Sequence, residues 1–233
     1  MTEQQRLAQV PDLLLRWYDS GRRVLPWREN PEPYRVWVSE IMLQQTRVEA
    51  VIPYFERFLS ALPTVSDLAQ APEPQLMKLW EGLGYYSRVR NLQKAAQVVC
   101  EQYGGELPGT SAQLSKLPGI GAYTAGAIAS IAFGECCTAV DGNVLRVISR
   151  VLERGWDIRA SSVKKQVTAL VAEIVPDDRP GDFNQSLMEL GAMVCLPNGQ
   201  PKCASCPLHA LCLSREHGRQ AVSYTHLTLP TIS

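Results

Sequence analysis

The 233-residue sequence lacks both a long hydrophobic run and an excess of charge of one sign. No stretch approaches the roughly 18 consecutive apolar residues of a transmembrane helix, which excludes a membrane-spanning protein. Lys and Arg number 23 and Asp and Glu number 23, so the overall basic excess common among nucleic-acid-binding proteins is absent. Any surface that binds phosphate must therefore be a limited region in which basic residues are concentrated.

The N-terminal region has no apolar core followed by a small-residue cleavage site, so we expect no signal peptide and a cytoplasmic location. Low-complexity segments and strand-like alternation are also scarce. Apolar residues instead recur at three- and four-residue spacing, which predicts an all-α protein with short connections. The expected helices span residues 3–20, 34–50, 52–60, 73–82, 86–103, 111–117, 122–133, 143–154, 161–175 and 182–194.

Residues 222–233 (VSYTHLTLPTIS) have no helical period and, apart from His226, no basic or acidic side chain. This string resembles the translation of a sequencing-library adapter, and we expect a non-native tail; a short natural tail is the alternative. Without it, 221 residues remain, with the same 23 basic and 23 acidic side chains. We expect the gene to continue beyond that point.

Four of the seven cysteines lie close together in the pattern C-x7-C-x2-C-x5-C. In a reducing compartment, cysteines in such numbers indicate metal ligation more than disulfides. Zinc sites with four cysteines usually separate two pairs by about 15 to 20 residues, so the closer spacing favours an iron–sulfur cluster. Zinc, or thiols without metal, are the alternatives. The four cysteines are Cys195, Cys203, Cys206 and Cys212.

Residues 117–121 read LPGIG, between two predicted helices. Gly119 and Gly121 allow a tight turn and a close backbone approach, and N–H groups at the start of the second helix point outward. Pro118, Gly119, Ile120 and Gly121 therefore form a candidate helix-hairpin-helix that binds a DNA phosphate. A Pro-Gly turn between two packed helices would look the same.

Two acidic residues are candidates for glycosidic bond cleavage, which commonly uses a proton donor and a second carboxylate. Glu40 has no cationic neighbour at helical spacing, and apolar surroundings would keep a proton on its carboxyl available for donation. Asp141 precedes a predicted helix, where an N-cap is the structural alternative. Residues 141–165 hold six Lys or Arg against three Asp or Glu, a local basic excess.

Five sequence blocks resemble the MutY family of adenine DNA glycosylases, within the helix-hairpin-helix DNA glycosylase superfamily. The resemblance covers about residues 8–215, and its blocks are LPWR, VWVSEIMLQQT, GLGYYSR, DGNVLRV and FNQSLMELGAMVC. It implies that Glu40 protonates N7 of an extruded adenine and that Asp141 stabilises the oxocarbenium-like sugar or bonds to it briefly. A base inside a duplex must be flipped out before such chemistry.

The resemblance also implies roles for eight further residues. Tyr123 and Asn143 would position the two acids and the water. Gln45 and Tyr85 would enter the base stack near the lesion. The adenine pocket would be lined by Trp27, Arg28, Leu43 and Gln185.

Tyr123 discriminates between two branches of the superfamily. The endonuclease III branch, which shares the cluster and the hairpin, has a lysine nucleophile at this position that forms a Schiff base and cuts the strand. Tyr123 cannot form an imine, so we expect base removal without efficient strand cleavage. An oxidised-pyrimidine glycosylase of the endonuclease III type and a non-catalytic DNA-binding iron–sulfur protein are the alternatives.

The resemblance implies a two-lobed all-α fold whose C-terminal loop holds a 4Fe-4S cluster. Residues 23–136 would form a six-helix lobe with the hairpin, and residues 1–22 with 137–215 the cluster lobe. The expected partner is double-stranded DNA containing adenine opposite 8-oxoguanine or guanine, bound by a monomer without membrane contact, in the cytoplasm at the nucleoid.

Two features depart from the family pattern. The first cysteine gap has seven residues where the family has six, and we expect residues 198–199 to accommodate the extra one as a bulge. The sequence also ends before the family's C-terminal 8-oxoguanine-recognition domain, so that domain is expected to be absent. We therefore expect adenine excision with poorer discrimination between 8-oxoguanine and guanine.

Overall fold

The computed structural model describes residues 1–221, and the expected non-native tail at 222–233 lies outside the described residues. The chain divides into two compact units. One runs without interruption from Arg23 to Ala139, and the other joins Met1–Arg22 to the chain from Val140 onward. Within residues 1–221 all regular elements are helices, which confirms the predicted all-helical fold.

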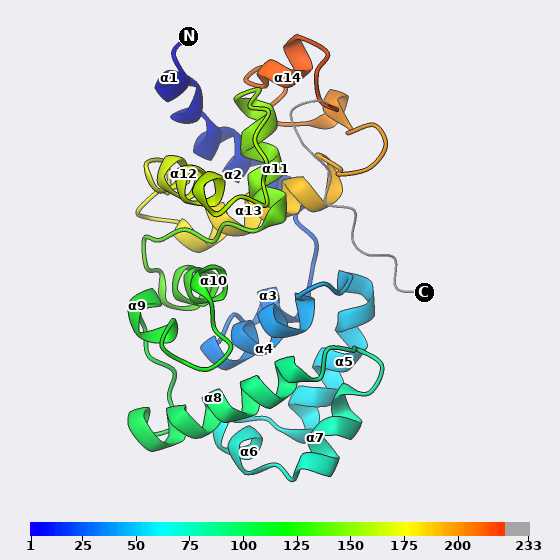
Figure 1. Ribbon diagram of the computed structural model, residues 1–233, viewed down its shortest axis with the longest axis vertical. Coiled ribbons are helices and arrows are strands. Elements are labelled where there is room, and N and C mark those ends of the chain that lie inside the picture. The colour runs from blue at the N-terminus through cyan, green and yellow to red at the C-terminus, as the bar shows by residue number, and fades with distance from the viewer. Residues whose placement is uncertain (222–233) are drawn as a thin grey trace. The chain divides into compact units, whose positions relative to one another are not determined.

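The uninterrupted unit is built around α4, which packs against α3, α5, α8 and α10. A helix that is apolar on most sides belongs in a core, and α4 buries Val36, Trp37, Val38, Ile41 and Met42. The helices of this unit, labelled in Figure 1, are α3 (Pro26–Glu29), α4 (Pro33–Leu43), α5 (Val48–Ala61), α6 (Val65–Gln70), α7 (Glu73–Trp80), α8 (Ser87–Tyr103), α9 (Ser111–Leu114) and α10 (Ala122–Phe133).

Small residues along α10 allow the following chain to approach it closely. A Cβ placed on Gly126 would lie 2.0 Å from the carbonyl oxygen of Thr138, so only glycine fits there. Elsewhere in the core of this unit, large side chains fill the space between helices, among them Phe55, Phe58 and Trp80, all fully buried. The ring of Phe58 meets that of Trp80 edge to face at 6.1 Å.

The second unit combines the two ends of the described chain. Helix α11 packs against α12, α13 and α14, and α2 packs against α13. Arg179 links α2 to α13 by ion pairs, because its Nη2 lies 2.6 Å from an Asp19 oxygen and 2.8 Å from an Asp182 oxygen. The elements of this unit are α1 (Glu3–Leu7), α2 (Val10–Gly21), α11 (Gly142–Val151), α12 (Ser161–Ala172), α13 (Pro180–Met193), the 3-10 helix η1 (Cys203–Ser205) and α14 (Leu213–Glu216).

The helix predicted over residues 34–50 is wrong at its C-terminal end. Helix α4 ends at Leu43 and α5 begins at Val48. Gln45 between them has a φ of 56°, which is incompatible with a right-handed helix. The periodic apolar pattern continues through this break, so the sequence did not reveal it. The predicted helix 3–20 is also interrupted, between α1 and α2.

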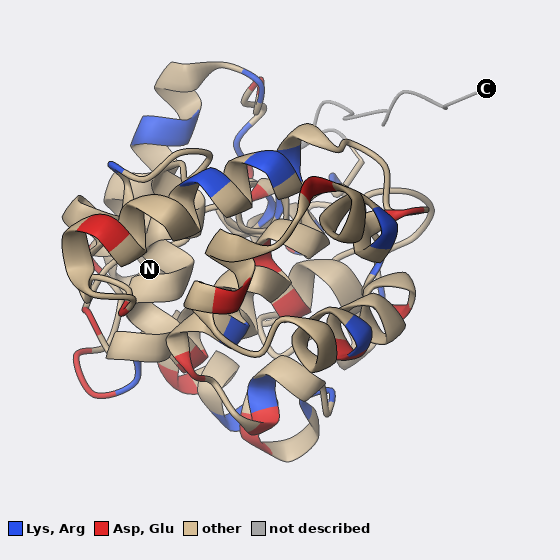
Figure 2. Ribbon diagram, turned by 90° about the horizontal axis from the view of Figure 1, so that it is seen from below, with Lys and Arg blue, Asp and Glu red and all other residues tan. Residues whose placement is uncertain are grey.

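No helix within residues 1–221 combines the length and apolar character needed to cross a bilayer. Basic and acidic segments are interspersed along the ribbon in Figure 2. Of the six basic residues counted in 141–165, Arg146 and Arg150 are buried, with 3% and 4% exposed, whereas Lys164 and Lys165 are exposed. Arg154 and Arg159 pair with Glu3 and Asp157.

Candidate active site and cysteine cavity

Glu40 lies in the buried part of α4, with 7% of the residue exposed. Its Oε2 accepts a hydrogen bond of 2.8 Å from the hydroxyl of Tyr123, in the first turn of α10. The two residues are 83 positions apart in the chain, and the packing of α4 on α10 brings them together. A largely desolvated carboxyl beside a phenolic donor can supply a proton to a bound base.

Asp141 caps α11, as the structural alternative predicted. Its Oδ1 accepts a hydrogen bond of 2.8 Å from the backbone N–H of Val144, and its Oδ2 one of 2.7 Å from Nδ2 of Asn143. Burial raises the pKa of the Asp141 carboxyl, whereas these two bonds and nearby Arg146 lower it. A carboxylate has about four acceptor positions, so capping leaves it able to face a developing positive charge.

Behind Asp141, a chain of hydrogen bonds continues to the backbone of the first cysteine. Oδ1 of Asn143 accepts from Arg146 Nη2 at 2.7 Å, and the same nitrogen donates to the carbonyl of Gly191 at 2.8 Å. Arg146 Nε donates to the carbonyl of Cys195 at 2.7 Å. A Cβ on Gly191 would lie 2.4 Å from Cβ of Asn143. Sequence reasoning gave Arg146 and Gly191 no role, although a glycine inside a helix is a signal of close packing.

The four predicted cysteine ligands line one small cavity, together with Arg150 and His209 among others. Burial raises the pKa of the Cys206 thiol to about 12, and the three other cysteines are near enough to raise it as well. Nη1 of Arg150 contacts Cys195 Sγ at 3.3 Å. Across residues 1–221, no three His, Cys, Asp or Glu side chains have the arrangement of a single metal-ion site. The four thiols and their shared cavity fit a thiolate-bound metal centre.

The seven residues between Cys195 and Cys203 form a closed loop. The backbone N–H of Lys202 donates to the carbonyl of Val194 at 2.9 Å, which brings the ends of the loop together. Gly199 within it has a φ of 74°, a left-handed conformation that glycine adopts without strain. This left-handed residue is one of the two, 198–199, at which the extra residue was expected.

The candidate hairpin joins α9 to α10. Gly119 has a φ of 75°, and a Cβ there would lie 2.7 Å from Cβ of Asn91 on α8, so both conformation and space require glycine. Gly121 is the N-cap of α10 and provides no capping side chain. The first N–H groups of α10 therefore lack a side-chain cap, as a phosphate-binding helix start requires.

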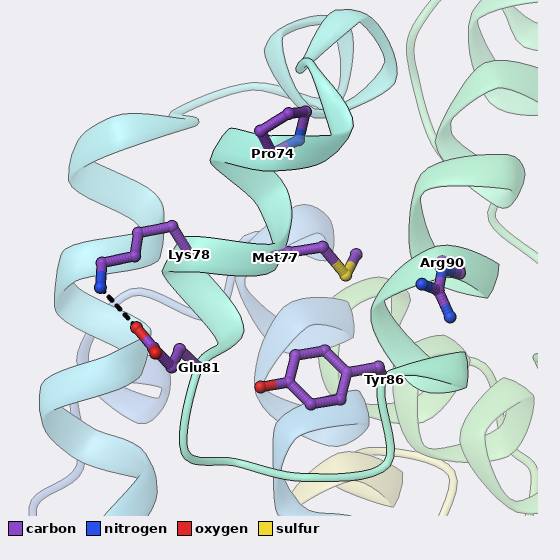
Figure 3. A pocket seen from close by; sticks show the side chains of 6 residues that line it. All are labelled: Pro74, Met77, Lys78, Glu81, Tyr86 and Arg90. Carbon is purple, nitrogen blue, oxygen red and sulfur yellow. Dashed lines mark hydrogen bonds and ion pairs between the residues drawn. The ribbon is translucent and has the colours of Figure 1, made fainter.

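Gln45 and Tyr85, the residues expected to enter DNA, lie in two short connections of the same unit. Gln45 follows α4, and Tyr85, 48% exposed, precedes α8. Both have positive φ, at 56° and 48°. Next to the Tyr85 connection, a hollow of about 530 Å³ opens between α7 and α8, with Tyr86 and Met77 on its walls and the Lys78–Glu81 ion pair beside them (Figure 3).

The four predicted pocket residues are distributed over both units. Trp27 is 6% exposed, and its ring packs edge to face on Phe55 at 5.2 Å. Arg28 donates to the carbonyl of Arg23 at 3.2 Å. Leu43 is the last residue of α4, and Gln185 lies on α13. The structure thus joins Glu40 to Tyr123 and Asp141 to Asn143, and it places Trp27 chiefly in the core.

Comparison with known proteins identifies the kind of chain that has this fold and these residues. Residues 38–174 match the family model of the HhH-GPD superfamily base excision DNA repair proteins. The adenine DNA glycosylase of Homo sapiens is 49% identical over 216 residues, covering 89% of this chain and 39% of the human protein. That of Buchnera aphidicola subsp. Baizongia pistaciae is 41% identical over 202 residues, covering 86% of this chain and 57% of its own.

Solved structures agree. A thermostable thymine-DNA glycosylase matches with a TM-score of 0.83 and 29% identity over 91% of this chain and 98% of its own. An endonuclease III trapped as a covalent intermediate with DNA matches with a TM-score of 0.78 and 27% identity over 94% of this chain and 99% of its own. The chain spans about two fifths of the length of its human relative, at 39%. It belongs to the HhH-GPD superfamily of base excision DNA repair proteins.

Proposed function

We propose that this chain is the catalytic part of an adenine DNA glycosylase that hydrolyses the N-glycosidic bond of adenine opposite 8-oxoguanine or guanine. The observation that carries the proposal is the buried Glu40 carboxyl held by the hydroxyl of Tyr123, where a strand-cutting relative would need a lysine. Relatives called adenine DNA glycosylase, up to 49% identical, support the choice of base.

In the proposed reaction, Glu40 gives its proton to N7 of an extruded adenine. The bond between C1′ of the sugar and N9 of the base then breaks, and its electron pair leaves with the base. Asp141, held by Val144 and Asn143, stabilises the cationic sugar as a carboxylate or bonds to it briefly. Water then adds to C1′, displacing any bond to Asp141, and gives its proton to the Glu40 carboxylate, which restores the acid and leaves an abasic site. The enzyme acts as a monomer on DNA of the nucleoid.

The test offers the protein three duplexes: adenine opposite 8-oxoguanine, thymine opposite guanine, and an oxidised pyrimidine opposite guanine. We expect release of adenine alone, with the strand left intact. Release of the oxidised pyrimidine alone, or a stable borohydride-trapped DNA adduct, would contradict the proposal in favour of the endonuclease III type. Release of thymine alone would also contradict it.

A second arm separates an enzyme from a DNA-binding protein. Glu40→Gln is expected to lower the single-turnover rate of adenine release by about 10²- to 10⁴-fold, the usual contribution of a general acid, while duplex affinity is retained. Glu49→Gln, an exposed position on α5, is the matched control and should leave the rate unchanged. A chain that binds the duplex and releases no base with Glu40 intact would be a binding protein.

We also propose that Cys195, Cys203, Cys206 and Cys212 hold a 4Fe-4S cluster. The support is the cavity that the four cysteines share and their close spacing in the chain. The cluster would cross-link the segment from α13 to α14, and no step of the base release is assigned to it. Iron and acid-labile sulfide in equal amounts, lost in Cys203→Ser, are the expected result, and stoichiometric zinc would contradict it.

A further inference from the structure

Arg88, on the first turn of α8, joins two connections that are distant in sequence. Its Nη1 donates to the carbonyls of Ile41, Met42 and Gln44 at 3.0, 3.0 and 2.6 Å. Its Nη2 donates to the carbonyls of Leu83 and Gly84 at 2.9 and 3.1 Å. One planar guanidinium therefore holds the end of α4 with one amino group and the connection before α8 with the other.

The bonded carbonyls explain why an arginine is needed here. The last four carbonyls of a helix have no partner within it, and the negative end of the helix dipole favours a cation. Helix α4 has no basic residue in its own last turn, and Arg88 supplies that charge from another helix. The guanidinium also lies over the rings of Trp80 and Tyr85, at 5.3 and 5.6 Å from their centres.

Each of the two segments leads directly into a residue in an unfavourable backbone conformation. Of the three non-glycine residues with positive φ in residues 1–221, two are Gln45 and Tyr85. Such conformations persist only where the surrounding structure holds them, and they often occur at functional sites. Arg88 binds the carbonyl of the residue directly before each of them, which is Gln44 before Gln45 and Gly84 before Tyr85.

We propose that Arg88 is a positioning residue that couples the Gln45 and Tyr85 connections, so that both side chains enter the base stack together. This inference rests on the proposed function. Lysine could not replace Arg88, because an ammonium is a single point of charge with three donors, whereas the guanidinium spans two sets of acceptors with a rigid fork.

The experiment compares Arg88→Lys with Arg90→Lys, two substitutions that keep the charge. Arg90 lies two residues further along α8, lines the hollow in Figure 3 and pairs with Glu73 through its side chain. Among residues 1–221, its guanidinium bonds none of the carbonyls that Arg88 holds. Two readouts are used. One is single-turnover release of adenine opposite 8-oxoguanine and opposite an abasic-site analogue, where no base pair must be opened. The other is the fluorescence of 2-aminopurine beside the lesion, which rises on unstacking.

We expect Arg88→Lys to slow release from the paired duplex by about 10²-fold, as misplacement of positioning groups does, and to abolish the fluorescence rise. Release opposite the abasic analogue should stay within about twofold of wild type, as for a substitution that spares the chemical step. Equal losses on both substrates, or a result equal to Arg90→Lys, would overturn the inference. If wild type releases no adenine at all, the proposed function fails, and the fluorescence comparison still decides the role of Arg88.

A second set of variants tests the coupling without changing Arg88. Gln45→Ala, Tyr85→Ser and the double variant alter exposed side chains and keep the carbonyls that Arg88 binds. Tyr85→Ser also removes the ring under the Arg88 guanidinium. If the two residues act as one unit, the double variant should lose no more than about twice what the worse single variant loses, because interacting residues are not additive. Fully multiplicative losses would show independent insertion and overturn the inference.

Discussion

The two carboxyl groups proposed for catalysis are held in opposite ways in the two units. Asp141 receives its hydrogen bonds from Asn143 and Val144, two and three residues further along the chain. Glu40 receives its hydrogen bond from Tyr123, 83 residues away. The Asp141 geometry is thus largely a local property of a helix start, whereas the Glu40 geometry exists only when α4 and α10 are packed together.

The largest effect should come from Asp141→Asn, because asparagine caps a helix as well as aspartate does while the charge is lost. We expect single-turnover adenine release to fall by at least about 10³-fold, within the range measured when acting groups are removed from enzymes. The cap, and with it the fold of the unit, should survive, as circular dichroism would show. A wild-type rate would contradict the catalytic role.

The same variant has a signed effect on stability. Burial raises the folded-state pKa of Asp141, so this group favours folding at low pH and loses that contribution as the pH rises through its folded pKa. Asn has no charge to bury. The difference in unfolding midpoint between Asp141→Asn and wild type should therefore shift in favour of the variant as the pH rises from about 4 to 8. A difference that stays constant with pH, or shifts toward wild type, would contradict this.

A smaller effect is expected from a change that disturbs Asp141 from a distance. In Gly191→Ala the new Cβ meets Asn143, which cannot retreat because Asp141 and Arg146 hold its side chain. Overpacking of this kind costs typically about 1–3 kcal/mol of unfolding free energy, and adenine release should slow as well. Gly155→Ala is the control, since nothing lies within 4 Å of a Cβ there. Equal denaturant midpoints for the two variants would show that Asn143 moves away from the added Cβ without a cost in stability.

The smallest effect should come from Tyr123→Phe, which removes one hydroxyl and keeps the ring. A single hydrogen bond contributes about 0.5–1.5 kcal/mol net, so we expect adenine release to slow by up to about tenfold. Tyr103→Phe on α8, which has no hydrogen bond from its hydroxyl among the described residues, should leave the rate unchanged. Because the Glu40–Tyr123 contact is tertiary, its loss should act on the rate more than on the helix content.

The fold could be predicted further than the site. Apolar spacing predicted helices over most of the observed elements, and the Asp141 cap followed from an acidic residue before a periodic segment. The prediction of one helix through residues 34–50 was wrong, because α4 ends at Leu43 and Gln45 has a φ of 56°. The carbonyl of Gln44 is bound there by Arg88, which is 44 residues away in the chain. The count of basic residues over 141–165 also did not reveal that Arg146 and Arg150 are buried inside the unit.

The sequence by itself determined the helical class, the helix start at Asp141, the tight turn at Gly119 and the close spacing of four cysteines. Each depends on residues within a few positions of one another, where backbone preference and helical period are decisive. Only the tertiary structure decided that Tyr123 meets Glu40, that Arg146 connects Asn143 to Cys195, and that Arg88 holds two connections together. Such pairs depend on how helices pack. The periodic pattern of one helix does not specify which distant side chain forms hydrogen bonds with the polar groups that the helix leaves unpaired.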